Sequence, residues 1–240
     1  MAWRIRLAAL LLLWSAAAAA RHGSGILEPS RATPGIRLEL VELPSASLGR
    51  AKYRLRAEGM PRGVTFVVWT KDFGQQFTEA FSGFRMDDAG MLVSVDGSGR
   101  PRRLEELALD PGPYPKGAVW MVALASDDHK LSAFAKVIPY PIAARDGTCV
   151  VSLELVSLFG YRFLASGFGF GPGEEVQVES RALGRVTPRK LRVSPGGLLP
   201  PDVISHGGIS ADRGARYTVK ARSCEVSIEY DWGEPALIRR

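Results

Sequence analysis

The 240-residue chain contains only two cysteines and three histidines, and it has no asparagine. Two cysteines exclude a disulfide-framework mini-protein and a cysteine-rich zinc module. Three histidines leave little scope for a multi-histidine metal centre, so we expect no metal and no cofactor. The absence of asparagine removes every N-glycosylation acceptor. What is present, 46% hydrophobic and 23% charged residues, is typical of a chain that buries a core.

The first 20 residues have the features of a secretory signal peptide. Arg4 and Arg6 precede an apolar segment over 7–14, and an alanine run ends in an A-x-A cleavage site before Arg21. The apolar segment and the alanine run together span 14 residues, fewer than the ~20 needed to cross a bilayer. We therefore expect an exported mature chain, periplasmic or secreted, with no transmembrane anchor. The 24 arginines against 7 lysines, with abundant alanine and glycine, are typical of a GC-rich bacterial coding sequence.

The basic excess of the chain is small. Removal of the signal peptide takes away two of the 31 basic residues, which leaves 29 basic against 25 acidic residues and a net charge of +4. A nucleic-acid-binding protein gathers its positive charge on one face, whereas here the two signs are mostly interspersed. Since the chain is also expected to be exported, we predict no nucleic-acid partner.

Alternating apolar and polar residues recur along the chain and predict half-buried β-strands. Leu38 and Leu40 alternate with charged residues, and Val226 and Ile228 alternate with polar ones. Clusters of Gly, Pro, Asp and Ser separate such segments, as turns do. One helix is expected, over 102–109. Many short strands with almost no helix predict an all-β fold, an antiparallel sandwich or barrel.

The chain also repeats itself. Four blocks occur twice in the same order, at separations of 115, 108, 107 and 97 residues: 38–43 with 153–158, 53–60 with 161–168, 84–92 with 191–199, and 117–126 with 214–223. Alternation alone aligns apolar residues in any two β-rich segments, but these blocks also share glycine, alanine, serine or identical polar residues. We interpret them as a tandem duplication.

The repeat defines an expected domain organisation. Two tandem immunoglobulin-like antiparallel β-sandwiches are predicted over 36–146 and 147–238, with the boundary near 139–147, where prolines and glycine interrupt the strand pattern. A flexible leader over 21–35 precedes them. A short tail is expected from Ile238 onward.

One segment carries a family resemblance. The sequence Gly167-Phe-Gly-Phe-Gly-Pro-Gly-Glu174, followed by Val176 and Val178, resembles the opening hairpin of bacterial extracellular immunoglobulin-like repeats of the IPT/TIG type. Those repeats commonly carry a G-x-G-F-x-P-G-E-x-V segment. Residues 214–219 are similar to the penultimate strand of immunoglobulin-like and fibronectin III-like modules. The first copy departs from the motif with Gly59-Met-Pro-Arg-Gly63. The resemblance implies spacers, adhesion units or accessory binding units, without catalytic residues to carry over.

The two cysteines are predicted to form a disulfide. Cys149 opens the first predicted strand of the second copy and Cys224 opens its last, and these strands can lie side by side in an immunoglobulin-like sandwich. Export to an oxidising compartment favours the bond. The aligned positions in the first copy are Pro34 and Asp127, so the disulfide would stabilise the second copy alone. A reactive thiol would need a CxxC motif or a neighbouring histidine, and neither is adjacent in sequence.

The candidates for catalysis are weak. Asp127 to His129 could contribute to a metal site, but three adjacent residues rarely supply a full coordination sphere, and a solvated turn is the favoured interpretation. The glycine-rich stretch 167–171 lacks the helix that a phosphate loop requires and is interpreted as a turn with Phe168 or Phe170 in the core. His206 lies in a glycine-rich loop and is expected to be exposed. A hydrolase with a site built from Asp127, His129 or His206 is kept as the third alternative, after the two binding functions described below.

Two stretches could bind a partner. The densest basic stretch would form a hairpin with several cations on one face, suited to an anionic partner, or else an ordinary solvated strand face: Arg181, Arg185, Arg189, Lys190 and Arg192. A second stretch crowds aromatic residues among amides and charges and could stack on sugars or a peptide, although half of them are expected in the core: Trp69, Phe73, Phe77, Phe81 and Phe84.

Together these patterns predict a non-catalytic envelope or extracellular binding module. Its expected partner is an envelope polymer or another exported protein. The alternative is a periplasmic folding or assembly accessory that grips client strands at an exposed sheet edge. The sequence does not indicate an oligomeric state.

Overall fold

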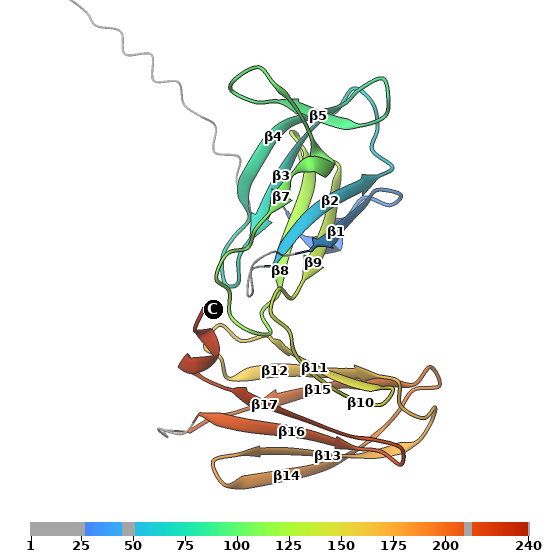
Figure 1. Cartoon of the computed structure of the whole chain (residues 1–240), viewed down its shortest axis with the longest axis vertical. Helices are drawn as coiled ribbons and strands as arrows, with labels where there is room; N and C mark the ends of the chain where they lie inside the picture. Colours follow the sequence, from blue (N-terminus) through green and yellow to red (C-terminus); the bar gives the residue numbers. More distant parts are fainter. Residues whose placement is uncertain (1–26, 45–50, 209–212, 240) are drawn as a thin grey trace, which may run out of the picture.

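The computed structural model describes residues 27–44, 51–208 and 213–239, and the expected signal peptide lies outside these residues. The described chain contains strands and three short 3-10 segments but no α-helix. Its strands form four antiparallel sheets, arranged as two β-sandwiches stacked along the long axis of the molecule (Figure 1). The all-β prediction is confirmed.

The first sandwich packs a small sheet against a larger one. The small sheet has the order β1-β2-β7 and the larger sheet the order β6-β5-β4-β3-β8-β9. Their strands are β1 (Arg37–Leu43), β2 (Lys52–Glu58), β3 (Thr65–Lys71), β4 (Thr78–Met86), β5 (Leu92–Val95), β6 (Pro101–Arg103), β7 (Ala108–Leu109), β8 (Trp120–Ser126) and β9 (Ser132–Val137).

The second sandwich has two four-stranded sheets, in the orders β10-β11-β12-β15 and β14-β13-β16-β17. Its strands are β10 (Ile142–Asp146), β11 (Cys149–Leu155), β12 (Arg162–Phe168), β13 (Glu175–Ala182), β14 (Arg185–Arg192), β15 (Leu198–Ser205), β16 (Gly214–Lys220) and β17 (Glu225–Asp231). The strand order and connections of the two sandwiches match once β10 is left out of the second and the β5–β6 hairpin is left out of the first. This match supports the duplication inferred from the sequence.

The opening hairpins of the two sandwiches share one close backbone contact. Gly59 has a φ of 76°, and a Cβ there would lie 2.1 Å from the carbonyl oxygen of Gly35. Gly169 has a φ of 84°, and a Cβ there would lie 1.9 Å from the carbonyl oxygen of Thr148. The structural counterpart of Gly59 is therefore Gly169, two residues beyond the Gly167 of the sequence alignment. Met60 and Phe170 follow these glycines into the core, so the first copy carries the same turn with different residues.

Two local expectations, the helix and the domain boundary, are corrected. The helix expected over 102–109 is replaced by β6, a 3-10 turn η3 (Leu104–Glu106) and β7. This chain path points Leu104 and Leu109 into the core. The expected boundary assigned 142–146 to the first copy, but these residues form β10, which pairs with β11 of the second sandwich.

The expected leader and tail are both held in place where they are described. Leu27 is 5% exposed, and η2 (Pro29–Arg31) follows it. The backbone N–H of Thr33 donates to the carbonyl of Ser132 over 2.8 Å, and the Ser132 hydroxyl donates to the carbonyl of Arg31. At the other end, η4 (Glu234–Leu237) leads to Arg239, which forms a β-bridge with Pro115.

The junction between the sandwiches is closely packed. Most of the buried apolar residues of the two sandwiches form one continuous cluster. The backbone N–H of Leu155 donates to the carbonyl of Gly117 over 2.8 Å, and Ala118 forms a parallel bridge with Leu155. Gly117 has a φ of 76°, and a Cβ there would lie 2.9 Å from Ile142. The loops of the first sandwich therefore lie directly against the second.

Candidate binding surface

The densest group of exposed apolar side chains lies in the connection between β11 and β12. Val156, Leu158, Phe159 and Tyr161 are four of the eleven large hydrophobic residues that are exposed in the described chain. Phe159 is the most exposed of them, at 71%. Single exposed apolar residues are ordinary, whereas a contiguous group marks an interaction site or a ligand groove. We name this group of four residues the apolar turn.

The backbone of the apolar turn is fixed by hydrogen bonds on all sides. Within it, the N–H of Gly160 donates to the carbonyl of Ser157 over 2.9 Å, and the N–H of Val156 donates to the carbonyl of Arg162. Two outside contacts hold it: the N–H of Gly233 donates to the carbonyl of Gly160, and the N–H of His206 donates to the carbonyl of Tyr161, both over 2.8 Å. Phe159 is therefore presented on an ordered support, which lowers the entropy lost when a partner binds.

An open cavity of about 690 Å³ adjoins the apolar turn. Its walls combine the turn with the start of β12 and the end of β15, and they include Val156, Leu158, Phe159, Tyr161, Arg162 and His206. The volume is in the range of small-ligand and side-chain pockets. Leu158 also reaches the β3–β4 loop of the first sandwich, since a Cβ on Gly74 would lie 3.0 Å from its side chain. The cavity is therefore placed beside the junction of the two sandwiches.

His206 supports the cavity wall from inside the second sandwich. Its Nε2 atom is hydrogen-bonded to the hydroxyl of Tyr230 over 2.7 Å, and its ring lies 5.4 Å from that of Trp232. Burial lowers the pKa of His206 below 6.5 and raises the pKa of Tyr230, because a partly desolvated site disfavours the charged form of each. The expectation that His206 is exposed is wrong: it is half-buried and paired.

An arginine completes this aromatic cluster. The guanidinium of Arg213 lies 4.4 Å from the ring centre of Trp232, in cation–π geometry. The ring of Tyr161 lies 6.0 Å from the same indole, and the Arg213 guanidinium also donates to the carbonyl of Gly208 over 3.1 Å. These contacts hold Gly208 and Arg213 next to the cavity.

The predicted basic stretch does form a hairpin, but its residues divide between two faces. The register of β13 and β14 places Arg181, Lys190 and Arg192 on the outer face and turns Arg185 and Arg189 to the other. Arg189 forms an ion pair of 2.6 Å with Asp202, whose side chain is 7% exposed and also accepts a hydrogen bond from the Tyr217 hydroxyl. The group of five therefore offers no single cationic patch.

The outer face of this sheet is also electrically balanced. By register it carries Arg181, Lys190, Arg192, Arg216 and Lys220 together with Glu175, Glu179, Glu225, Glu229 and Asp231. Ion pairs join Lys190 to Glu175 over 2.7 Å, and Arg216 to Glu229. Interleaved opposite charges make a solvated strand face rather than a site for an anionic polymer.

The predicted aromatic surface is mostly interior. Trp69 and Phe77 are 5% and 3% exposed, so they cannot stack on a ligand, and that part of the prediction is corrected. They belong to a second apolar cluster on the outer face of β3 and β8, where Leu27 is also buried. Phe73 and Phe81 are half-buried. Leu27, which belongs to the same cluster, is distant in sequence, so the excess of aromatic residues in a polar segment does not reveal that Trp69 is covered.

The loop from Asp127 to His129 is a turn between β8 and β9. The Asp128 carboxylate accepts hydrogen bonds from the Ser126 hydroxyl over 2.7 Å and from the N–H of Lys130. The Ser126 bond is the main reason that the pKa of Asp128 falls to about 2. Within the described residues no group of three or more His, Cys, Asp or Glu is placed to hold a metal ion.

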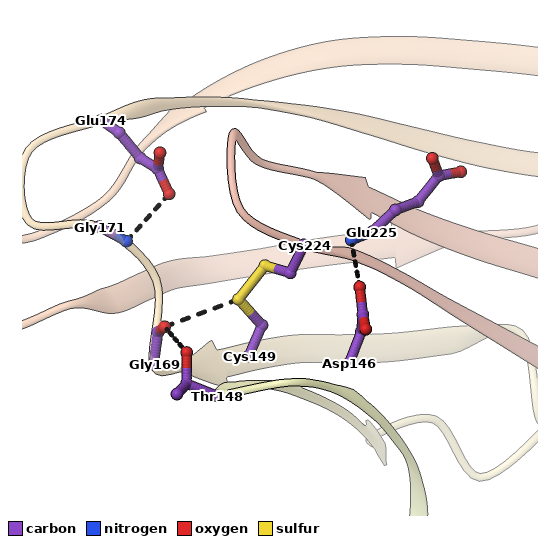
Figure 2. The surroundings of a disulfide bond; sticks show 8 residues. All are labelled: Asp146, Thr148, Cys149, Gly169, Gly171, Glu174, Cys224 and Glu225. Carbon is purple, nitrogen blue, oxygen red and sulfur yellow. Dashed lines mark hydrogen bonds between the residues drawn. A yellow bond between two sulfur atoms is a disulfide. The ribbon is translucent and has the colours of Figure 1, made fainter.

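The cysteines form the predicted disulfide, which joins the two sheets of the second sandwich. Cys149 begins β11 and Cys224 immediately precedes β17, with their Cα atoms 6.4 Å apart (Figure 2). Nearby, the N–H of Glu225 donates to the Asp146 carboxylate over 2.8 Å, and the Thr148 hydroxyl donates to the carbonyl of Gly169. The bond therefore links the sheets at the end of the sandwich that carries the Gly169 turn.

The similarity of this chain to known proteins is distant. No protein-family model and no curated protein sequence matches this chain. A tetra-tandem repeat from the extending region of a large adhesion protein aligns with 82% of this chain and 48% of its own length, at 10% identity and a TM-score of 0.25. A structure of a 1.5-MDa bacterial ice-binding adhesin aligns with 84% of this chain and 65% of its own length, at 10% identity and a TM-score of 0.23. This chain thus spans about half the length of the first of these structures.

A further finding concerns membrane-spanning segments. None of the helical segments in the part of the chain that the structure describes is long and apolar enough to cross a bilayer.

Proposed function

We propose that this protein is an exported, non-catalytic binding module that contacts its partner through the apolar turn and the adjoining cavity. The observation that carries the proposal is the exposure of Leu158 and Phe159 on a backbone held by hydrogen bonds from His206, directly after β15, and from the C-terminal segment. Rigid, exposed apolar side chains around a cavity are the features of a binding hot spot. The disulfide is in keeping with an oxidising compartment.

Strand gripping at a sheet edge is less well supported. The open side of the second sandwich has β14 and β15 as its edge strands. Pro188 lies within β14, and Pro200 and Pro201 lie within β15. Proline has no N–H to donate to an added strand and is a common protection of sheet edges. These two edges are therefore poor templates for a client strand.

Co-sedimentation with washed envelope fractions of a GC-rich Gram-negative bacterium tests the proposal. Four forms of the exported chain are compared at low and high salt: the wild type, Leu158→Ser/Phe159→Ser, Leu198→Ser/Val203→Ser and Arg181→Ser/Arg192→Ser. Leu198 and Val203 are a matched control, because they are exposed apolar residues on β15 outside the cavity. We expect the wild type to be retained at both salt concentrations, because salt does not screen apolar contacts. Only the Leu158/Phe159 variant should lose this retention.

Retention that high salt abolishes, and that requires Arg181 and Arg192, would contradict the proposal. So would retention that is equal in the Leu158/Phe159 variant and the wild type. Either result would mean that the binding site lies on the basic hairpin or on another face of the molecule.

A further inference from the structure

The composition of the cavity wall indicates the chemistry of its occupant. Val156 and Leu158 are aliphatic, and beside them Phe159 is the most exposed aromatic ring. Sugar rings stack on flat aromatic faces, whereas branched aliphatic side chains pack against other apolar side chains. A wall that mixes aliphatic and aromatic groups therefore favours a protein side chain over a glycan.

The charge on the same cavity wall is of one sign, positive. Arg162 is exposed at the start of β12 and lines the cavity, and the described lining residues include no aspartate or glutamate. Trp232, whose ring neighbours those of Tyr161 and His206 in the wall, lies under the guanidinium of Arg213. Arginine forms strong, directional hydrogen bonds with carboxylates. A carboxylate next to the inserted apolar group would therefore be attracted to Arg162.

We propose that the cavity receives an apolar side chain of a partner protein, next to an aspartate or glutamate that pairs with Arg162. This inference rests on the proposed function and specifies its partner. The apolar group fills the space between Leu158, Phe159 and His206, and the acidic group lies at the rim. Apolar contact supplies affinity, and the charge selects among partners.

Selection from a phage-displayed random peptide library tests this directly. The immobilised baits are the wild type, Phe159→Ser, Arg162→Glu and the control Arg192→Glu, which changes an exposed arginine on β14 outside the cavity. We expect the wild type and the control to enrich peptides with a large apolar residue beside Asp or Glu. Arg162→Glu should enrich the same apolar residue beside Lys or Arg, and Phe159→Ser should lose the enrichment.

Individual peptides then give the size of the effect. An acidic peptide selected by the wild type should bind Arg162→Glu at least tenfold more weakly in fluorescence anisotropy, and exchange of its acidic residue for lysine should restore binding. Near-ultraviolet circular dichroism checks that each variant is folded. A soluble oligogalacturonate serves as the acidic-glycan probe, and we expect it not to compete.

Three results would overturn the inference: no enrichment with the wild type, the same charge preference with Arg162→Glu as with the wild type, or oligogalacturonate binding that needs Arg162 but not Phe159. None of them bears on whether envelope retention depends on Leu158 and Phe159. Failure of this inference is therefore distinguishable from failure of the proposed function.

Discussion

Gly160 and Gly233 lie in direct backbone contact, and a Cβ atom on Gly160 would come within 2.0 Å of the Gly233 carbonyl oxygen. Gly160 also has a φ of 74°, a conformation that residues with a side chain rarely adopt. The pair joins the apolar turn to the segment that follows β17. The lack of a side chain at Gly160 is what allows the turn to lie so close to the segment that follows β17.

We predict that Gly160→Ala destabilises the protein by at least about 2 kcal/mol. The left-handed conformation alone costs about 1–2 kcal/mol, and the new methyl group must also displace the Gly233 carbonyl. Gly173→Ala is the matched control, because Gly173 has a φ of 72° but open space around its Cβ position. Urea unfolding should show a clearly larger loss for Gly160→Ala, and equal losses would mean that the contact with Gly233 has no energetic weight.

The fold was largely predictable from the sequence, but the register of the two copies was not. Because side chains alternate with a period of two, an alignment that slips by two residues keeps every side chain on its face. The alignment of Gly59 with Gly167 instead of Gly169 is an error of this kind. The backbone contacts of the glycines with Gly35 and Thr148 identify the correct register, and no pattern of hydrophobicity reports them.

The sequence pattern conceals the candidate binding surface for a related reason. Val156 to Leu158 repeats the pattern of the first strand and was interpreted as part of it, whereas β11 ends at Leu155. The usable signal was Phe159-Gly160, an aromatic residue directly before a glycine at a turn. Conversely, Trp69 and Phe77 indicated a surface because the segment that covers them, around Leu27, is distant in sequence.

The half-buried His206 predicts a pH dependence of stability. Its pKa in the folded chain is lowered below the 6.5 of the unfolded chain, so the unfolded state binds a proton more readily as the pH falls. The contribution of His206 to the free energy of unfolding is fully present above pH 6.5. It is lost as the pH falls through the pKa of the ring in the unfolded chain and then through its lower pKa in the folded chain. The loss is less than about 1.4 kcal/mol per pH unit, because a single ring takes up at most one proton on unfolding.

The measurement is urea unfolding at pH 7.5 and 5.5 for the wild type and His206→Gln. The variant keeps a hydrogen-bonding partner for the Tyr230 hydroxyl but does not titrate. We expect the stability difference between the two pH values to be smaller in the variant. An identical difference in both proteins would assign the pH dependence to other groups.

Loss of the disulfide should weaken the protein considerably. Cys149 and Cys224 are separated by 75 residues, and the closure of such a loop in the unfolded chain corresponds to about 4 kcal/mol. We predict a loss of this order for Cys149→Ala/Cys224→Ala, measured by urea unfolding. Addition of reductant should destabilise the wild type and leave the variant unchanged. A loss below about 1 kcal/mol would show that the hydrogen bonds around Asp146 and Gly169 hold this end without the covalent link.

Asp202, the partner of Arg189 on β14, should contribute far more to stability than Glu175, the exposed partner of Lys190 on the same strand. Its carboxylate pairs with Arg189 over 2.6 Å and accepts a hydrogen bond from the Tyr217 hydroxyl over 2.9 Å. Asp202→Ala therefore leaves the Arg189 guanidinium and the buried Tyr217 hydroxyl without their acceptor. We predict a loss of about 3 kcal/mol, the lower end for a broken buried pair, since a third of the Arg189 side chain is exposed. Glu175→Ala removes the exposed partner of Lys190 and should change stability far less, because solvent screens an exposed ion pair. If urea unfolding gave equal losses for the two variants, the network of Arg189, Asp202 and Tyr217 would be no more stabilising than a surface ion pair.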